Sequence, residues 1–180
     1  LALIFCQTKR DVDELYRQLH ERGYKVEALH GDYSQNQRDQ VMQKFRNHEL
    51  DLLIATDLAA RGIDSKLDMV VNYNVPENPE TYVHRIGRTG RAGREGLAIS
   101  FVSPEDYRQL YAIEKLIKTR LQYRDLPTRE ELKSHRQDFL QKRIDDGIKD
   151  VESADYVELA AKLLESESPL EMLAATLRVA

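Results

Sequence analysis

Hydrophobic and polar positions follow two alternating patterns along the first 120 residues. Short apolar runs, typical of buried strands, cover residues 1–6, 26–30, 51–56, 69–73 and 97–102. Between them, apolar residues recur every three or four positions, as on one face of a helix, over residues 9–22, 34–47, 82–91 and 104–121. Strands that alternate with helices predict a doubly wound α/β domain, with a parallel sheet covered by helices on both faces.

Polar segments follow three of the predicted strands, at residues 30–32, 55–57 and 74–76. In a parallel sheet the carboxyl ends of neighbouring strands lie at one edge, and ligands bind to the loops at that edge. We therefore expect these three segments to lie close together and to contribute to a binding site.

The alternation stops after residue 121, and only helical patterns follow. Thr128 and Glu131 form a capping-box pattern for a helix that we expect to break at Asp146 and Gly147. A second amphipathic stretch covers residues 156–164, and Ser168 with Pro169 opens a third. The sequence predicts two regions: an α/β domain at residues 1–121 and an all-helical extension at residues 122–180.

Charge is distributed unevenly between these regions. The chain has 180 residues and a net charge of −4, with 41% hydrophobic and 32% charged residues. From Asp150 on there are seven acidic and two basic residues, a net charge of −5, whereas the preceding residues carry 25 basic and 24 acidic ones, a net charge of +1. The overall acidity therefore does not exclude nucleic-acid binding by the α/β domain. The local acidity of residues 150–180 argues against such binding by that stretch.

Cysteine content and hydropathy indicate the compartment. Cys6 is the only cysteine and lies in an apolar run, so we expect a core residue in a reducing cytoplasm and no internal disulfide. No run of 18 apolar residues and no signal-peptide pattern occurs, so we expect neither a membrane span nor secretion. Because the chain opens inside a strand-like run, we expect it to be part of a longer protein.

The segment 84–93 carries the strongest chemical signal in the chain. It contains three arginines and three glycines in ten residues. If the helix continues through Arg91, then His84, Arg88 and Arg91 share one face, opposite an apolar patch of Tyr82, Val83 and Ile86. Arginines gathered on one face favour an anionic ligand, and a guanidinium is well suited to phosphate. The alternative is a solvated basic helix end.

The motifs together resemble the C-terminal RecA-like domain of DEAD-box RNA helicases. The similarity covers residues 1–120 and rests on segments 1–9, 30–32, 35–38, 55–64 and 84–91, in the family's order and spacing. Ile63, Ser65 and Asn74 depart from the usual pattern, but none of them occupies a phosphate-facing position. The resemblance implies a RecA-like doubly wound fold.

The resemblance also implies an ATP site. It identifies Arg88 and Arg91 as arginine fingers, which stabilise the charge that develops on the transferred phosphoryl group. It places His84 as the residue that couples this segment to a partner domain. It implies that Arg85, next to His84, contacts that domain and belongs to the ATP site, together with Gly62. Asp64 matches the carboxylate that accepts hydrogen bonds from the ribose, although a turn or helix cap is the alternative.

Single-stranded RNA is the second ligand that the resemblance implies. Gly31 permits close approach of a backbone, and Arg38 and Thr56 offer phosphate contacts that do not depend on base sequence. Thr8 is a further candidate, although its position as an ordinary helix N-cap needs no such role.

The chain lacks the other half of an ATPase site. No G-x-x-x-x-G-K-[ST] loop and no Asp-Glu-Ala-Asp segment occurs, so no motif is present to hold the ATP phosphates or Mg²⁺. We expect ATP and Mg²⁺ to be bound by an N-terminal RecA-like domain of the same protein, and the present chain to be inactive alone. The glycines at 87, 90 and 93 do not follow a strand, which argues against a dinucleotide fingerprint.

The tail resembles the helical extension of bacterial cold-shock DEAD-box helicases, which implies a homodimer through residues 128–180. Its candidate interface residues are leucines: Leu163, Leu164, Leu170, Leu173 and Leu177. The alternative is a helical cap folded on the same domain. For the whole chain, two further hypotheses remain: the second motor domain of a related DNA helicase, and a non-catalytic interaction module.

Overall fold

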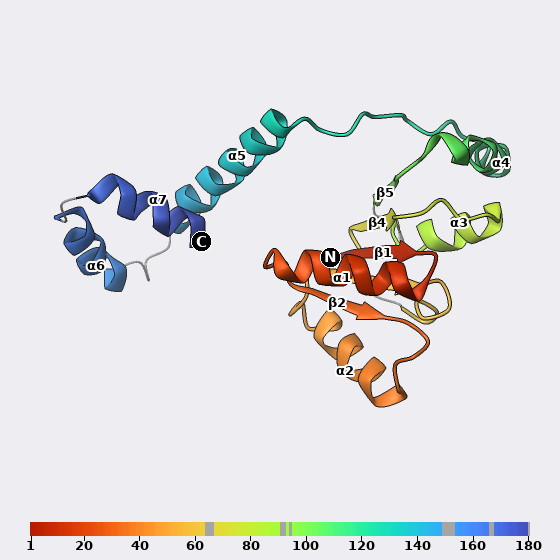
Figure 1. Ribbon diagram of the computed structural model, residues 1–180, viewed down its shortest axis with the longest axis horizontal. Helices are drawn as coiled ribbons and strands as arrows, with labels where there is room; N and C mark the ends of the chain where they lie inside the picture. Colours follow the sequence, from red (N-terminus) through yellow and green to blue (C-terminus); the bar gives the residue numbers. More distant parts are fainter. Residues whose placement is uncertain (64–66, 91–92, 94, 149–153, 166–167, 180) are drawn as a thin grey trace. The chain divides into compact units, whose positions relative to one another are not determined.

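The computed structural model describes all residues except 64–66, 91–92, 94, 149–153, 166–167 and 180. The chain divides into two compact units, Leu1–Leu121 and Gln122–Ala180. The first unit holds a sheet flanked by helices, and the second consists of helices (Figure 1).

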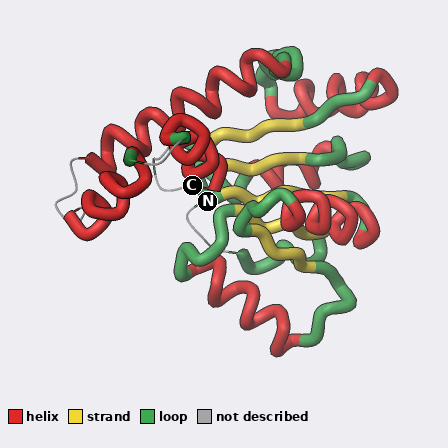
Figure 2. The backbone as a smooth tube through the Cα atoms, turned by 60° about the vertical axis from the view of Figure 1, so that its left-hand side comes forward, coloured by secondary structure: helices red, strands yellow, loops and turns green. Residues whose placement is uncertain are grey.

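The sheet has five parallel strands in the order β2-β3-β1-β4-β5. Their bounds are β1 Ala2–Cys6, β2 Val26–Leu29, β3 Leu52–Thr56, β4 Met69–Asn72 and β5 Leu97–Ser100. The central strand β1 pairs on both sides, with Ile4 opposite Ile54 of β3 and Val71 of β4. Figure 2 shows the strands side by side with helices around them. The predicted parallel α/β sheet is confirmed.

Helices α1 (Lys9–Glu21) and α2 (Gln35–Arg46) cover opposite faces of this sheet. Val12 of α1 packs with Ile4, Cys6 and Ile54, whereas Phe45 of α2 packs on the other face of the same strands. Each helix begins with a capping box, formed by Thr8 with Asp11 and by Ser34 with Gln37. The strand and helix bounds agree with the sequence prediction to within two residues here. Cys6 is fully buried, and burial raises the pKa of its thiol to about 12.

Helix α3 (Pro79–Ile86) ends earlier than the sequence predicts. The expectation of a helix through Arg91 is wrong, because the chain turns at Gly87 and the Thr89 hydroxyl donates to the Leu67 carbonyl at 2.7 Å. The helix buries Tyr82 and Arg85, while Val83 is exposed. The buried face of α3 therefore differs from the predicted apolar patch, because the charged residue Arg85 is buried on it in place of Val83.

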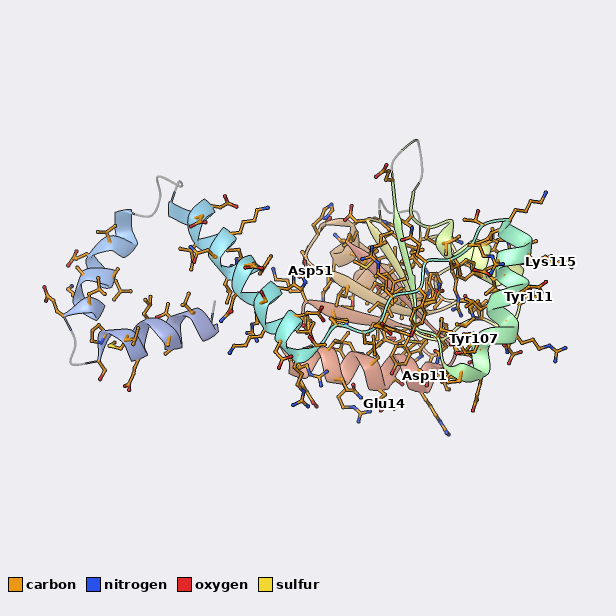
Figure 3. The ribbon with its side chains drawn as sticks, turned by 90° about the horizontal axis from the view of Figure 1, so that it is seen from above. Asp11, Glu14, Asp51, Tyr107, Tyr111 and Lys115 are labelled. Carbon is orange, nitrogen blue, oxygen red and sulfur yellow. The ribbon has the colours of Figure 1, made fainter. Side chains whose placement is uncertain are left out.

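The segment after β5 forms a 3₁₀ turn, Pro104–Asp106, and helix α4, Tyr107–Ile117. Ile113 of α4 packs with Tyr82 and Val75 in a third apolar cluster. Tyr107, Tyr111 and Lys115 lie exposed along the outer side of α4 (Figure 3). The helix ends at Lys118, which adopts a left-handed conformation with φ of 53°, so the prediction of a helix to Leu121 is too long.

Strand β5 departs from the predicted burial. It pairs with β4 alone among the described strands, and its apolar side chains are exposed on both faces: Leu97 (53%) and Ile99 (37%) on one face and Ala98 on the other. The expectation that helices cover both faces is confirmed for the central strands and wrong for β5. No described helix packs on this edge strand closely enough to bury it.

The second unit contains α5 (Arg129–Ile148), α6 (Ala154–Leu164) and α7 (Pro169–Val179). Thr128 and Glu131 form the predicted capping box, with the Thr128 N–H donating to Glu131 Oε2 at 2.7 Å. The expected break at Asp146 and Gly147 is wrong, because α5 runs through both. None of the side chains whose burial is described in this unit is buried. Within the described residues, no helix is both long and apolar enough to cross a membrane.

Candidate RNA and nucleotide interface

The carboxyl ends of four strands meet at one edge of the sheet. Thr8 lies two residues beyond β1, Gly31 two residues beyond β2, Thr56 at the end of β3 and Asn74 two residues beyond β4. Because the strands are parallel and in register, these residues belong to the same edge. The structure therefore gathers Gly31, Thr56 and Thr8, as the sequence predicts.

The loop after β2 is held by a buried histidine. His30 Nε2 lies 3.0 Å from Asp13 Oδ1, and the Asp32 backbone N–H donates to His30 Nδ1 at 3.4 Å. This pattern assigns the proton to Nε2, since Nδ1 accepts. The Tyr33 ring meets the imidazole edge to face. A hydrogen bond from Lys9 holds the pKa of Asp32 below its usual range. Gly31 is thus exposed on a loop that both of its neighbours anchor.

Arg38, in the first turn of α2, lies next to the end of β3 in the fold. Its Nη2 donates to the Ala59 carbonyl at 3.1 Å, which ties α2 to the turn that follows β3. Thr8 caps α1 by accepting from the Asp11 N–H at 3.2 Å. The N-cap role of Thr8 is therefore confirmed, and its RNA contact stays a prediction.

Arg85 is the most heavily bonded charged side chain at this edge. Its Nε and Nη2 form a bidentate ion pair with the two carboxylate oxygens of Asp57, both at 2.7 Å. Its Nη1 donates to Asn72 Oδ1 at 3.2 Å and to the Asn74 carbonyl at 2.9 Å. The guanidinium carbon also lies 5.2 Å from the centre of the Phe5 ring. With 2% of its surface exposed, Arg85 bonds inside the domain, whereas the sequence places it at a surface beside ATP.

The end of α3 and the turn after it present the other predicted nucleotide contacts. His84 is exposed, and Arg88 is partly exposed with its Nη1 donating to the Ile63 carbonyl at 3.2 Å. Because α3 ends at Ile86, Arg88 does not share a helical face with His84, although the two remain four residues apart. Gly62 adopts a positive φ of 79°, which explains glycine at that position. Arg91 and Asp64 lie outside the described residues.

The sequence prediction includes Asp57 in a strand-end segment but misses its ion pair with Arg85, and it misses Asn72 as part of this site. Asn72 is fully buried inside β4 and also donates from Nδ2 to Ser100 Oγ at 3.0 Å. A polar residue in an otherwise apolar strand was the available signal, because a buried amide needs partners. Among the described residues, no group of three His, Cys, Asp or Glu side chains is placed to hold a metal ion.

Comparison with known proteins identifies the class of this domain. The model of the helicase conserved C-terminal domain matches residues 1–93. The ATP-dependent RNA helicase CshA of Listeria monocytogenes is 44% identical over 180 residues, covering 99% of this chain and 35% of that protein.

Two solved structures are also similar. The C-terminal domain of the DEAD-box protein Dbp5 is 44% identical with a TM-score of 0.60, covering 64% of this chain and 69% of that one. S. cerevisiae Dbp5 bound to RNA and ADP BeF3 is 38% identical with a TM-score of 0.65, covering 82% of this chain and 38% of that one.

The chain therefore belongs to the helicase conserved C-terminal domain family, in its DEAD-box branch. It spans about a third of the length of the curated relatives it matches.

Proposed function

We propose that this domain is the second motor domain of an ATP-dependent RNA helicase, which separates short RNA duplexes locally. The observation that carries the proposal is that one small domain places Arg88, in the turn after α3, beside an edge of strand ends that carries Gly31, Thr56 and the nearby Arg38. Arg88 is suited to ATP phosphates and the edge to an RNA backbone.

The RNA contacts would depend on the backbone and not on the bases. Gly31 offers its N–H without a side chain in the way, and no atom lies within 4 Å of the position where a Cβ would be. Arg38 and Thr56 add a charge and a hydroxyl, which bind phosphates without reading sequence. The relative solved with RNA and ADP BeF3, S. cerevisiae Dbp5, supports this assignment.

The residues present also fit one side of an ATP molecule. Arg88 is partly exposed, and His84 is exposed four residues before it. When bound, ATP supplies the phosphoryl group that is transferred to water, with Mg²⁺ held by the preceding RecA-like domain. Arg88 would neutralise charge that develops on that group, and Gly62 and the predicted contacts Asp64 and Arg91 would complete the site.

Replacement of Arg88 by alanine in the full-length protein tests the nucleotide half of the proposal. We expect ATP turnover to fall by up to about 10³-fold, because a finger stabilises the transition state, while RNA affinity without nucleotide changes little. Arg17→Ala, which removes an exposed arginine from α1 outside this edge, is the matched control. Turnover of Arg88→Ala within twofold of that control would remove Arg88 from the mechanism.

We also propose that the helical unit, residues 128–180, joins two chains as a homodimer. Leu164, Leu170 and Leu173 are each more than half exposed, and burial of such a side chain contributes about 1.5–3 kcal/mol. The side chain of Leu163 lies outside the described residues. Light scattering after size exclusion should give a dimer mass at tens of micromolar and a monomer mass for Leu173→Asp. A monomer without the substitution would favour a cap folded on its own domain.

A further inference from the structure

The polar cluster around Arg85 has more connections than a structural ion pair requires. Four hydrogen bonds from one guanidinium reach Asp57, Asn72 and the Asn74 carbonyl. Asn72 extends the cluster to Ser100 of β5, and Asn74 Oδ1 accepts from the Gln7 N–H at 3.0 Å. One side chain of α3 is thereby bonded to the ends of β3 and β4, and through them to β5 and the loop after β1.

Burial of this charge is not needed for stability alone. Buried ion pairs can often be replaced by apolar side chains of similar volume at little or no cost, because desolvation offsets the attraction between the charges. The neighbouring inner position of α3, Tyr82, shows that the same helix packs well through an aromatic side chain. A fully bonded guanidinium does add directional restraint, since its planar fork fixes the angle between partners.

Each residue of the ion pair lies next to one of the proposed ligand sites: Asp57 next to the RNA site and Arg85 next to the nucleotide site. Asp57 directly follows Thr56, and its side chain keeps 43% of its surface exposed at the strand-end edge. Arg85 directly follows His84, and its carbonyl accepts from the Arg88 N–H at 3.1 Å. A shift of the loop after β3 would therefore act on the turn that carries Arg88 through two 2.7 Å bonds and one backbone hydrogen bond.

We propose that Arg85 is a positioning residue that couples RNA contact at Thr56 to the placement of Arg88. This inference rests on the proposed function and assigns Arg85 an internal role in place of direct contact with ATP. Lysine could not perform it, because a single ammonium cannot hold both oxygens of Asp57 in one plane while also donating to Asn72 and Asn74.

An NMR titration of the 180-residue chain with a single-stranded RNA oligonucleotide tests the coupling without ATP. We expect RNA to shift the amide signals of Gly31 and Thr56 directly and those of Arg85 and Arg88 indirectly. The Asp57→Asn substitution keeps the shape of the side chain but weakens its bidentate pair with Arg85. In this variant the RNA-induced amide shift of Arg88 should become smaller, while that of Gly31 should persist.

The outcomes separate the coupling from the proposed function. Shifts at Gly31 and Thr56 without any at Arg88 in the unchanged chain would overturn the coupling and leave RNA binding intact. Equal shifts at Arg88 with and without Asp57→Asn would also overturn it. Absence of shifts at all these residues at saturating RNA would overturn both proposals.

Kinetics of the full-length protein provide a second measurement. For Arg85→Lys and Asp57→Asn we expect RNA stimulation of ATP turnover to fall by about 2- to 30-fold, the range for residues in a connected network. Nucleotide KM should change little, because Arg85 does not touch ATP. Ser100→Ala is the matched control, since it removes a hydrogen bond from the β5 end of the same cluster. An equal loss of stimulation in Ser100→Ala would show a merely structural role.

Discussion

Helices α2 and α7 carry similar apolar spacing and meet very different surroundings. In α2, Val41 and Phe45 stand four residues apart and are buried against the sheet. In α7, Leu170 and Leu173 stand three residues apart and are 78% and 52% exposed. The difference shows that an amphipathic pattern indicates which face of a helix can be buried. Whether that face is buried depends on a surface, such as the sheet, against which it can pack.

The same contrast separates the two units. The first contains three apolar clusters, built on the two faces of the sheet and between α3 and α4. The second has a capping box at the start of α5, yet none of its side chains with described burial is buried. Helices as short as α6 and α7, with 11 residues each, are marginal when isolated in water, because nucleation is costly and packing supplies most of their stability. We therefore expect the two units to respond differently to the same kind of substitution.

The largest difference should follow from truncation of an apolar side chain in each unit. Phe45→Ala leaves a cavity in the main core and should lower the free energy of unfolding by about 3–5 kcal/mol. Leu170→Ala in α7 should change it by less than about 0.5 kcal/mol at high dilution. Urea unfolding followed by circular dichroism measures both. A large, concentration-dependent effect of Leu170→Ala would break the comparison by showing that α7 is buried by a second chain.

Substitution of a glycine by alanine should change stability in opposite directions in the two units. A Cβ at Gly96 would collide with the backbone of Gly90 and the Thr89 hydroxyl, so Gly96→Ala should cost about 1–3 kcal/mol. A Cβ at Gly147 meets open space inside α5, so Gly147→Ala should stabilise that helix by about 0.5–1 kcal/mol. Thermal unfolding reports the first change and helical ellipticity the second. Loss of ellipticity in Gly147→Ala would contradict the continuous α5.

The smallest effect concerns pH at the start of α5. Hydrogen bonds from the Thr128 backbone N–H, and then from its hydroxyl, hold the pKa of Glu131 below its usual range. A lowered folded pKa means that this stabilisation is present above the unfolded value of about 4.3 and is lost as pH falls through the folded value. The Thr128 amide signal in NMR should move accordingly between pH 5 and pH 3. Glu131→Gln should abolish that movement, and its persistence would exclude the cap as the cause.

Much of the local structure follows from the sequence alone. The apolar runs and the capping residues Thr8, Ser34 and Thr128 predict the strands and most helix starts correctly, because each signal acts within a few residues. The resemblance places Gly31, Thr56 and Arg88 in the candidate site, since motif order and spacing carry that information. The inactivity of the chain alone and the RNA contact of Thr8 stay predictions.

What the sequence by itself determined was which segments form strands and helices and which edge of the sheet carries polar residues. Only the tertiary structure decided that α3 ends before Arg88, that β5 is left open, and that Arg85 points inward to Asp57. These outcomes depend on partners distant in the chain, such as Leu67 for Thr89 and Asp57 for Arg85. A buried charge is stable only where such partners converge, and their convergence is a property of the assembled sheet.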